Sequence, residues 1–421
     1  MPLSAQGVQS VKTLLDGATN EGPTGLNGLV FVVADKSGST LVEHASGTRS
    51  INGKDPMDTD TSFWIASCTK IVATIAVLQL YEQGKLPLDD PAFVQRLAPE
   101  IGAKKVYADG VHGADQEQGV TMRMLLAHTA GFAYNFFDPR VSMYARPTGI
   151  DEFNGDEEDI LNSPMVNQPA ETSPDIAGSM WEYGVNIDWA GIILERLTKQ
   201  KLNDYMQEHI FAPLGIADVT MFPGEAMQRN LAYMHQRDAG TGALVERNHL
   251  YRRALRQTSR EQQDKFLHSA GAGLFAKPKE YVKVLVALLN DGVSPTTGKR
   301  VLKEETVRMM WENQIPNQPN FARGGPPAAD PLLANSVPEM YPQEGDPPQG
   351  WGLSFFLTIS PGATGRGANT AWWCGLSNLF WWCDREKGIA GFLAGQVLPF
   401  GDPKVIQTWV AAEKAIYDGL E

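Results

Sequence analysis

The chain has 421 residues, of which 43% are hydrophobic and 20% are charged, a composition typical of a globular protein with one large domain or two smaller ones. Its formal net charge of −13 argues against nucleic acid or an anionic membrane surface as a partner. The cysteines Cys68, Cys374 and Cys383 form no C-x-x-C pair, so reduced thiols are expected. Because no apolar run could span a bilayer and the N-terminus lacks a secretory pattern, the sequence predicts a cytoplasmic protein without a membrane partner.

The sequence pattern in the first half of the chain predicts an N-terminal helix, a hairpin and then further helices. An amphipathic N-terminal helix precedes two β-branched runs around a Lys-Ser-Gly turn, which predict a β-hairpin over 28–47. A very apolar helix begins near Ser67 and ends at Gly84. From there to about residue 265 the pattern predicts helices joined by polar loops.

The second half predicts a helix, a long loop and strands. An amphipathic helix over 278–292 is followed by a stretch rich in proline and glycine, 316–350, which we expect to be a lid or a mobile loop. Strands are expected after it, the first over 351–359, and a final helix over 403–417. The order predicts an α/β domain made of 1–66 and 266–421, with a mainly helical domain, 67–265, inserted between them.

Ser67 and Lys70 form the strongest candidate for a reactive centre. They are three residues apart at the start of the apolar helix, so they share one face of it. Burial favours the neutral form of a lysine, and a neutral amine can remove the proton of a serine hydroxyl and so activate a nucleophile. The alternative is a capping serine beside a lysine that extends to solvent, since about one S-x-x-K is expected by chance in a chain of this length.

Two further segments could complete such a centre. Tyr183 precedes a helix for which Asn186 is a natural N-cap, and its phenol is either a core hydroxyl or a partner that shares a proton with Lys70. The segment WWCGLSN ends a strand at Gly375, where the backbone can approach a ligand closely. The backbone N–H groups of Ser67 and Leu376 could there form an oxyanion hole.

These segments, in this order, resemble the serine β-lactamase and penicillin-binding-protein superfamily. LLAHTAGF (125–132) and SAGAGLFAKPKEYVKVL (269–285) are similar to further segments of that superfamily. The resemblance covers nearly the whole chain and is strongest to the class C-like (family VIII) esterase branch, within it to the fungal lovastatin acyltransferase (simvastatin synthase) type. It implies an antiparallel sheet flanked by helices, Ser67 as the nucleophile, and Lys70 with Tyr183 as the base. It also implies that His128 is structural.

Two departures from the penicillin-active members bear on the substrate. Trp373, Cys374 and Gly375 stand where those members carry Lys-Thr-Gly, so the ammonium group that meets a β-lactam carboxylate is replaced by an indole. Tyr183 is followed by Gly-Val-Asn instead of x-Asn, which favours Asn186 as a helix cap. Both changes favour an esterase or acyltransferase over a β-lactamase or D,D-peptidase.

Aromatic residues are expected to gather at this site. The candidates are Phe136, Phe137, Tyr144, Trp372, Trp373, Trp381 and Trp382. Because strand residues alternate between two faces, either Trp373 or Trp372 lines the site while the other packs inward. Phe136 and Tyr144, with Trp373, Cys374 and Gly375, are the predicted substrate-binding residues, and they favour an apolar acyl group or alcohol.

The sequence thus predicts a serine acyl-transfer enzyme that acts on esters or thioesters of small, polyketide-like molecules. The acceptor is an alcohol in an acyltransferase or water in a carboxylesterase, and the donor could be a free or a carrier-protein thioester. The alternatives are β-lactamase or D,D-peptidase chemistry, or a catalytically silent binding protein on the same scaffold. No cofactor is expected, and the seven scattered histidines suggest no metal site.

Overall fold

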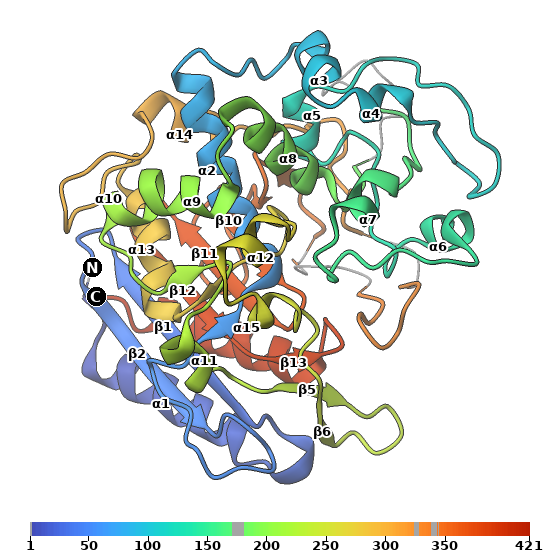
Figure 1. The fold of residues 1–421 in the computed structure, drawn as a ribbon. Coiled ribbons are helices and arrows are strands. Elements are labelled where there is room, and N and C mark those ends of the chain that lie inside the picture. The colour runs from blue at the N-terminus through green and yellow to red at the C-terminus, as the bar shows by residue number, and fades with distance from the viewer. Residues whose placement is uncertain (1, 171–180, 324–327, 338–342, 344) are drawn as a thin grey trace.

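A computed structural model describes residues 2–421 except 171–180, 324–327, 338–342 and 344. Its centre is an antiparallel sheet of seven strands drawn from both ends of the chain (Figure 1). Across the sheet the strands are β2 (Thr40–Gly47), β1 (Gly28–Asp35), β12 (Ile389–Ala394), β11 (Leu379–Asp384), β10 (Thr370–Gly375), β9 (Phe356–Thr358) and β8 (Gln349–Trp351). The inner strands β1, β11 and β12 are buried along nearly their whole length because both faces of the sheet are covered.

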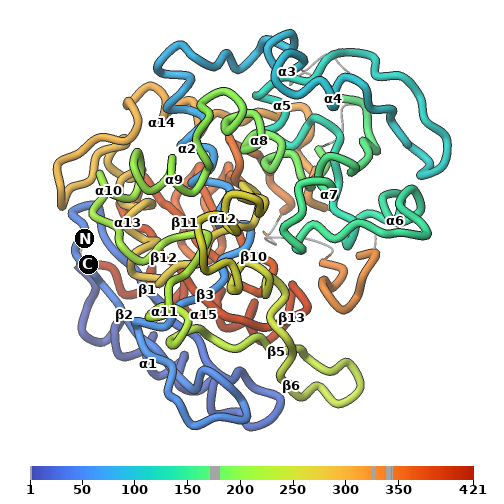
Figure 2. Tube along the Cα trace, in the orientation of Figure 1, coloured from blue at the N-terminus to red at the C-terminus, as the bar shows by residue number. Residues whose placement is uncertain are grey.

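Helices from the two chain ends cover one face of the sheet, and a helix from the middle of the chain covers the other. α1 (Ala5–Thr19) packs on α15 (Pro403–Asp418), and Trp409 of α15 stacks on Phe380 of β11. Tyr281 of α13 (Pro278–Leu289) meets Phe392 of β12 on the opposite face. The chain ends lie side by side in Figures 1 and 2, joined by a bridge between Leu3 and Leu420.

Of the remaining helices, α3 to α7 gather at the upper right of Figure 1. α2 (Thr69–Glu82) is buried from Thr69 to Leu80, as expected for a helix that is apolar nearly all round. The other helices are α3 (Pro91–Leu97), α4 (Pro99–Ala103), α5 (Met122–Ala127), α6 (Pro139–Ala145), α7 (Glu157–Asn162), α8 (Asn186–Thr198), α9 (Leu202–Met206), α10 (Ala212–Leu214), α11 (Glu225–Arg229), α12 (Arg260–Asp264) and α14 (Glu304–Met310). Short turns of other helix types are η1 (Gly22–Thr24), η2 (Ala66–Cys68), η3 (Gln207–Phe211) and η4 (Ala254–Arg256).

Two small sheets tie the middle of the chain to its ends, and they correct the expectation of helices alone up to residue 265. One contains β3 (Phe63–Trp64), β7 (Phe275–Ala276) and β4 (Val219–Thr220), and the other contains β13 (Val397–Leu398), β5 (Met234–Arg237) and β6 (Leu244–Arg247). β4, β5 and β6 have at most four residues each, and most of those in β5 and β6 are polar, so their sequences carry no clear strand pattern. Their partners are set by tertiary contacts.

The single strand expected over 351–359 is instead a tight hairpin of β8 and β9, in which Trp351 pairs with Phe356. Ser354 turns the chain with a φ of 71°, and its hydroxyl accepts a hydrogen bond from Thr74 of α2. A Cβ at Gly352 would lie 2.4 Å from the carbonyl oxygen of Met310, so the turn requires glycine there.

Candidate active site

Ser67 lies in the tight turn η2, between strand β3 and helix α2, and this turn packs against β10 and β11 of the central sheet. The residue before it, Ala66, has a φ of 44°, in the left-handed region that residues other than glycine rarely adopt. Such strain is held only where the surrounding structure fixes the backbone, and it is common at functional sites. The turn leaves Ser67 partly exposed to a cavity while its neighbours Ala66 and Cys68 are fully buried.

Lys70, one turn further into α2, is fully buried and makes three hydrogen bonds. Its Nζ lies 3.0 Å from Ser67 Oγ, 3.0 Å from the hydroxyl of Tyr134 and 2.9 Å from the carbonyl oxygen of Gly271. The carbonyl oxygen can only accept, so it holds one N–H. When Lys70 is neutral and a second N–H points to Tyr134, its lone pair is directed at the Ser67 hydroxyl.

Burial lowers the pKa of Lys70 from its usual 10.5 to about 8, and the negative charge of Asp188 offsets part of this effect. Asp188 is itself buried on α8, where its carboxylate accepts hydrogen bonds from the hydroxyl of Ser269 at 2.6 Å and from the N–H of Gly271 at 3.0 Å. The same segment, 269–271, therefore links Asp188 to the Lys70 ammonium group. Lys70 can change protonation state near neutral pH, as a general base requires.

Tyr183 lies beside this pair but does not hydrogen-bond to Lys70. Its hydroxyl accepts a 3.0 Å hydrogen bond from the indole N–H of Trp373, and Lys70 Nζ lies 4.8 Å from the centre of its ring. The position next to the Lys70 nitrogen is taken by Tyr134, which the sequence analysis did not single out. A signal was present, because Tyr134 follows the HTAGF segment by two residues.

Neither phenol ionises near neutral pH. Burial raises the pKa of Tyr134 and of Tyr183 well above 10, although contact with the Ser67 hydroxyl acts in the opposite direction for both. A tyrosinate stabilised by the lysine, one possibility raised by the sequence, is therefore disfavoured. Lys70 is the group of the three whose proton is exchanged near pH 8.

The two tyrosines are expected to differ in their effect on the pH dependence of turnover. Tyr134→Phe and Tyr183→Phe should each lower kcat by about 10²-fold, because each removes a hydroxyl beside Ser67. Only Tyr134→Phe removes an acceptor of the Lys70 ammonium group, so only this variant should shift the alkaline rise of kcat to lower pH. Initial rates of ester cleavage between pH 6 and 10 test this, and an equal shift in both variants would contradict the assignment.

The N–H groups expected to form an oxyanion hole lie in two segments that approach closely. A Cβ at Gly375, at the end of β10, would lie 2.6 Å from the carbonyl oxygen of Ile65, which precedes the η2 turn. Within the described part of the chain, the N–H groups of Ser67 and Leu376 donate no hydrogen bond to another protein group. Both residues line the same cavity, so both donors are available to a ligand there.

His128 and Asn186 form a structural pair behind the site. The Nδ1 atom of His128 lies 2.9 Å from the side-chain nitrogen of Asn186, which also donates to the carbonyl oxygens of Phe132 and Glu182. Burial keeps the pKa of His128 well below 6.5, so the ring is neutral. The expectation that Asn186 caps α8 is wrong, because Val185 occupies the N-cap position and the Asn186 side chain turns inward.

A cavity of about 370 Å³ opens in front of Ser67. Its walls are rich in aromatic side chains and come from the helical part of the chain, from β10, from the 316–350 loop and from the segment after β13. They contain Phe136, Phe137, Phe153, Trp181, Tyr183, Phe321, Trp373 and Phe400. The predicted residues Phe136, Trp373, Cys374 and Gly375 all line this cavity.

The structure decides between Trp372 and Trp373 and places Tyr144 away from the cavity. Trp373 lines the cavity, and Trp372 packs on the other face of the sheet against Phe356 and Trp409. Tyr144 does not line the cavity, so its prediction as a substrate-binding residue is wrong. It is 38% exposed on α6 and packs against the ring of Tyr107 at 4.6 Å.

The charged side chains at one end of the cavity are engaged by the protein itself. Arg140 donates to both carboxylate oxygens of Asp138, to Glu182, to Asn167 and to a backbone carbonyl oxygen. These contacts occupy all three nitrogens of the guanidinium group. Arg140 is therefore not available to bind the carboxylate of a substrate.

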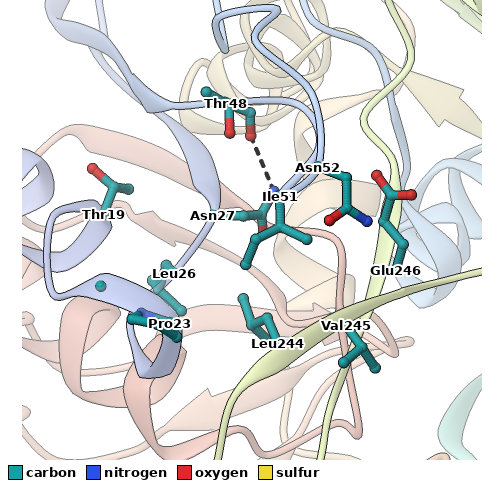
Figure 3. Close-up of a pocket in the computed structure, with 11 residues that line it drawn as sticks. Thr19, Pro23, Leu26, Asn27, Thr48, Ile51, Asn52, Leu244, Val245 and Glu246 are labelled. Atoms are coloured by element: carbon teal, nitrogen blue, oxygen red, sulfur yellow. Dashed lines mark hydrogen bonds between the residues drawn. The ribbon is translucent and has the colours of Figure 1, made fainter.

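A larger cavity of about 570 Å³ lies elsewhere, between the end of α1, the segment after β2 and strand β6 (Figure 3). It is lined by Thr19, Gly22, Pro23, Leu26, Asn27, Thr48, Ile51, Asn52, Leu244, Val245 and Glu246. None of the predicted site residues is among them, and it contains no pair of a nucleophile and a base. Among the described residues, no cluster of His, Cys, Asp or Glu side chains could hold a metal ion, and no helix is long and apolar enough to cross a membrane.

Comparisons with known proteins agree with this geometry. The β-lactamase family matches residues 15–415. The lovastatin esterase of Penicillium rubens is 32% identical over 400 residues, which cover 89% of this chain and 90% of that protein. The monacolin J acid methylbutanoyltransferase of Aspergillus terreus is 30% identical over 93% of this chain and 91% of that protein.

Solved structures lead to the same group. A mutant of simvastatin synthase from Aspergillus terreus superposes with a TM-score of 0.79 at 28% identity, over 98% of this chain and 95% of that one. The antiparallel sheet flanked by helices, which the resemblance implied, is thereby confirmed. The chain belongs to the β-lactamase family and is a serine acyl-transfer enzyme of its esterase and acyltransferase group.

Proposed function

We propose that the protein transfers acyl groups of small, apolar, polyketide-like molecules through an ester formed on Ser67. The observation that carries this proposal is the 3.0 Å contact between Ser67 Oγ and the buried Lys70 amine at the mouth of an aromatic cavity. Lys70 and the tyrosines supply the proton chemistry, and the N–H groups of Ser67 and Leu376 supply the oxyanion hole.

Acylation begins with neutral Lys70. Its lone pair takes the proton of the Ser67 hydroxyl as Oγ forms a bond to the acyl carbon, and the carbonyl oxygen becomes an oxyanion beside the two N–H groups. The tetrahedral intermediate then expels the alcohol or thiol, which takes the proton back from Lys70, directly or through a tyrosine hydroxyl. Lys70 is neutral again, and the acyl group remains on Ser67.

Deacylation runs the same steps with a second nucleophile. An alcohol or water gives its proton to Lys70 and attacks the acyl carbon, and Ser67 Oγ leaves with that proton. With an alcohol the product is a new ester, and with water it is a carboxylic acid. Because both outcomes share one acyl-enzyme, the fit of the acceptor in the cavity decides between them.

The substrate class follows from the cavity walls and from the relatives. Eight aromatic side chains favour an apolar acyl group or alcohol, and two relatives are named for lovastatin and monacolin J acid, respectively. β-Lactam recognition has less support, because Trp373 replaces the lysine of the penicillin-active members and Arg140 is fully engaged. We include acyl thioesters, free or on a carrier protein, among the donors, and the cytoplasmic location stays a prediction from the sequence.

Competition between water and an alcohol tests the proposal. The protein is supplied with p-nitrophenyl esters and acyl thioesters of increasing chain length, with and without an apolar polycyclic alcohol, and the acid and ester products are quantified. We expect rates to rise with acyl apolarity and the alcohol to divert the acyl group into an ester. Efficient hydrolysis of a β-lactam without turnover of any ester or thioester would overturn the proposal.

Trp373→Lys tests the substrate argument separately. A lysine would place an ammonium group in the aromatic wall and remove the hydrogen bond to Tyr183, so kcat/KM for apolar esters should fall by about tenfold or more. Trp373→Phe keeps the wall apolar and removes the same hydrogen bond, so it isolates the effect of the charge. If both variants lost the same activity, the charge argument would be wrong.

A further inference from the structure

Gln396, just beyond the end of β12, links the two segments that carry the oxyanion hole. It is 2% exposed, and its side-chain nitrogen lies 2.9 Å from the carbonyl oxygen of Trp64, 2.9 Å from Ser377 Oγ and 3.0 Å from the carbonyl oxygen of Gly395. Two of these neighbours are carbonyl oxygens, which only accept, so the amide NH₂ must face them.

Two of these acceptors lie close in sequence to the residues of the proposed oxyanion hole, Ser67 and Leu376. Trp64 ends β3, three residues before Ser67, and Ser377 directly follows Leu376. The buried Gln396 amide therefore connects β3, which leads into the Ser67 turn, to the turn after β10, which carries the N–H group of Leu376. The Gln396 side chain does not line the cavity, so it does not contact the substrate.

The turn after β10 is also held from its far side. Asn378 has a φ of 62°, a conformation that asparagine tolerates better than most residues. Its side-chain nitrogen donates to the carbonyl oxygens of Val397 and Pro399, each at 2.8 Å. These bonds fix the turn to the segment after β12, but they do not reach the Ser67 turn. The connection to that turn runs through Gln396 and through the close approach at Gly375.

We infer that Gln396 is a positioning residue that sets the separation of the Ser67 and Leu376 N–H groups, and so the fit of the oxyanion hole to the tetrahedral intermediate. The inference rests on the proposed function, because it assigns a role within the same acyl transfer. It predicts that loss of the Gln396 amide weakens binding of the oxyanion while the cavity still binds the substrate. The loss should therefore appear in kcat and not in KM.

Gln79 on α2 provides a matched control. Its side-chain nitrogen also bridges two carbonyl oxygens, those of His209 and Val301, each at 3.0 Å. Both glutamines are buried. Gln79 lies outside the cavity lining, so its replacement removes the same kind of bridge without touching the site.

The test compares Gln396→Leu with Gln79→Leu on pairs of esters that differ only in a carbonyl oxygen or a thiocarbonyl sulfur. Sulfur is a weak hydrogen-bond acceptor, so an oxyanion hole accelerates the oxygen ester more than the sulfur ester. We expect Gln396→Leu to lower kcat for the oxygen ester by roughly 10- to 100-fold, with KM within about twofold. In Gln396→Leu the ratio of the oxygen-ester rate to the sulfur-ester rate should also fall. Gln79→Leu should preserve this ratio.

An unchanged ratio in Gln396→Leu, whatever its overall activity, would overturn the inference. Ser377→Ala is a milder second variant in case Gln396→Leu does not fold, because it removes one anchor of the same bridge and should lower the ratio in the same direction. Failure of the proposed function looks different. In that case Ser67→Ala would retain ester turnover, and the inference would fall with it.

Discussion

Replacing Ser67 with alanine is expected to abolish the covalent acyl-enzyme and to lower ester turnover by about 10⁴-fold or more. The oxygen that forms the acyl bond is lost. The Tyr134 hydroxyl also contacts Lys70 Nζ, but burial raises the pKa of that phenol well above 10, so it is a poor nucleophile. Intact-protein mass spectrometry after incubation with an acyl donor measures the effect directly.

Ser336→Ala is the control for this experiment. Ser336 lines the same cavity but lies on the 316–350 loop, where its hydroxyl accepts a hydrogen bond from the N–H of Ala328. This variant should gain one acyl mass like the wild type. A mass gain of the same size in Ser67→Ala would place the acyl group on another residue and would contradict the mechanism.

The local features of the site could be predicted from the sequence because they depend on short spacing. Ser67 and Lys70 are about one helical turn apart, and the apolar helix that follows Ser67 buries the Lys70 amine beside the Ser67 hydroxyl. The glycine of WWCG marked the close approach of two backbones, and the structure brings Gly375 against the Ile65 carbonyl oxygen. The family resemblance added the order of these segments along the chain and the fold that joins them.

The features that the sequence did not predict depend on contacts between distant segments. Tyr134 lies in the loop after α5 and meets Lys70 of α2 only in the folded chain, and its one local signal is its place two residues after HTAGF. Asn186 has the residue type of a helix cap, yet the buried His128 offers its side chain a partner inside the fold. Tyr144 has the right type for an aromatic wall, but α6 directs it to Tyr107 and to solvent.

Part of the 316–350 loop lies outside the described residues, which exclude 324–327, 338–342 and 344. The described residues of this loop include Phe321 and Val337, and both line the cavity in front of Ser67. The described part of the loop therefore lies beside the cavity. Its mobility stays a prediction.

Lys70→Ala is expected to lower kcat by about 10³-fold, and the wild type should show a rise of kcat with pH that follows deprotonation of Lys70. Burial lowers the pKa of this lysine to about 8, so the reactive neutral form is the minor one at pH 7 and predominates at pH 9. From pH 6 to pH 9 the neutral fraction, and with it kcat, should increase roughly 100-fold and then level off. Lys70→Ala should lose this dependence together with its activity.

Two further variants distinguish Lys70 from other groups that titrate in this range. Burial also raises the pKa of Glu152 to about 8, but its carboxyl accepts the Asn135 N–H and does not contact Ser67, so Glu152→Gln should keep the inflection near pH 8. The charge of Asp188 raises the pKa of Lys70, so Asp188→Asn should move the inflection to lower pH. An inflection that disappeared in Glu152→Gln, or that moved to higher pH in Asp188→Asn, would show that another group is the base. The shift in Asp188→Asn follows from the place of Lys70 in the fold, where burial lowers the pKa of its amine and the nearby Asp188 carboxylate raises that pKa in part.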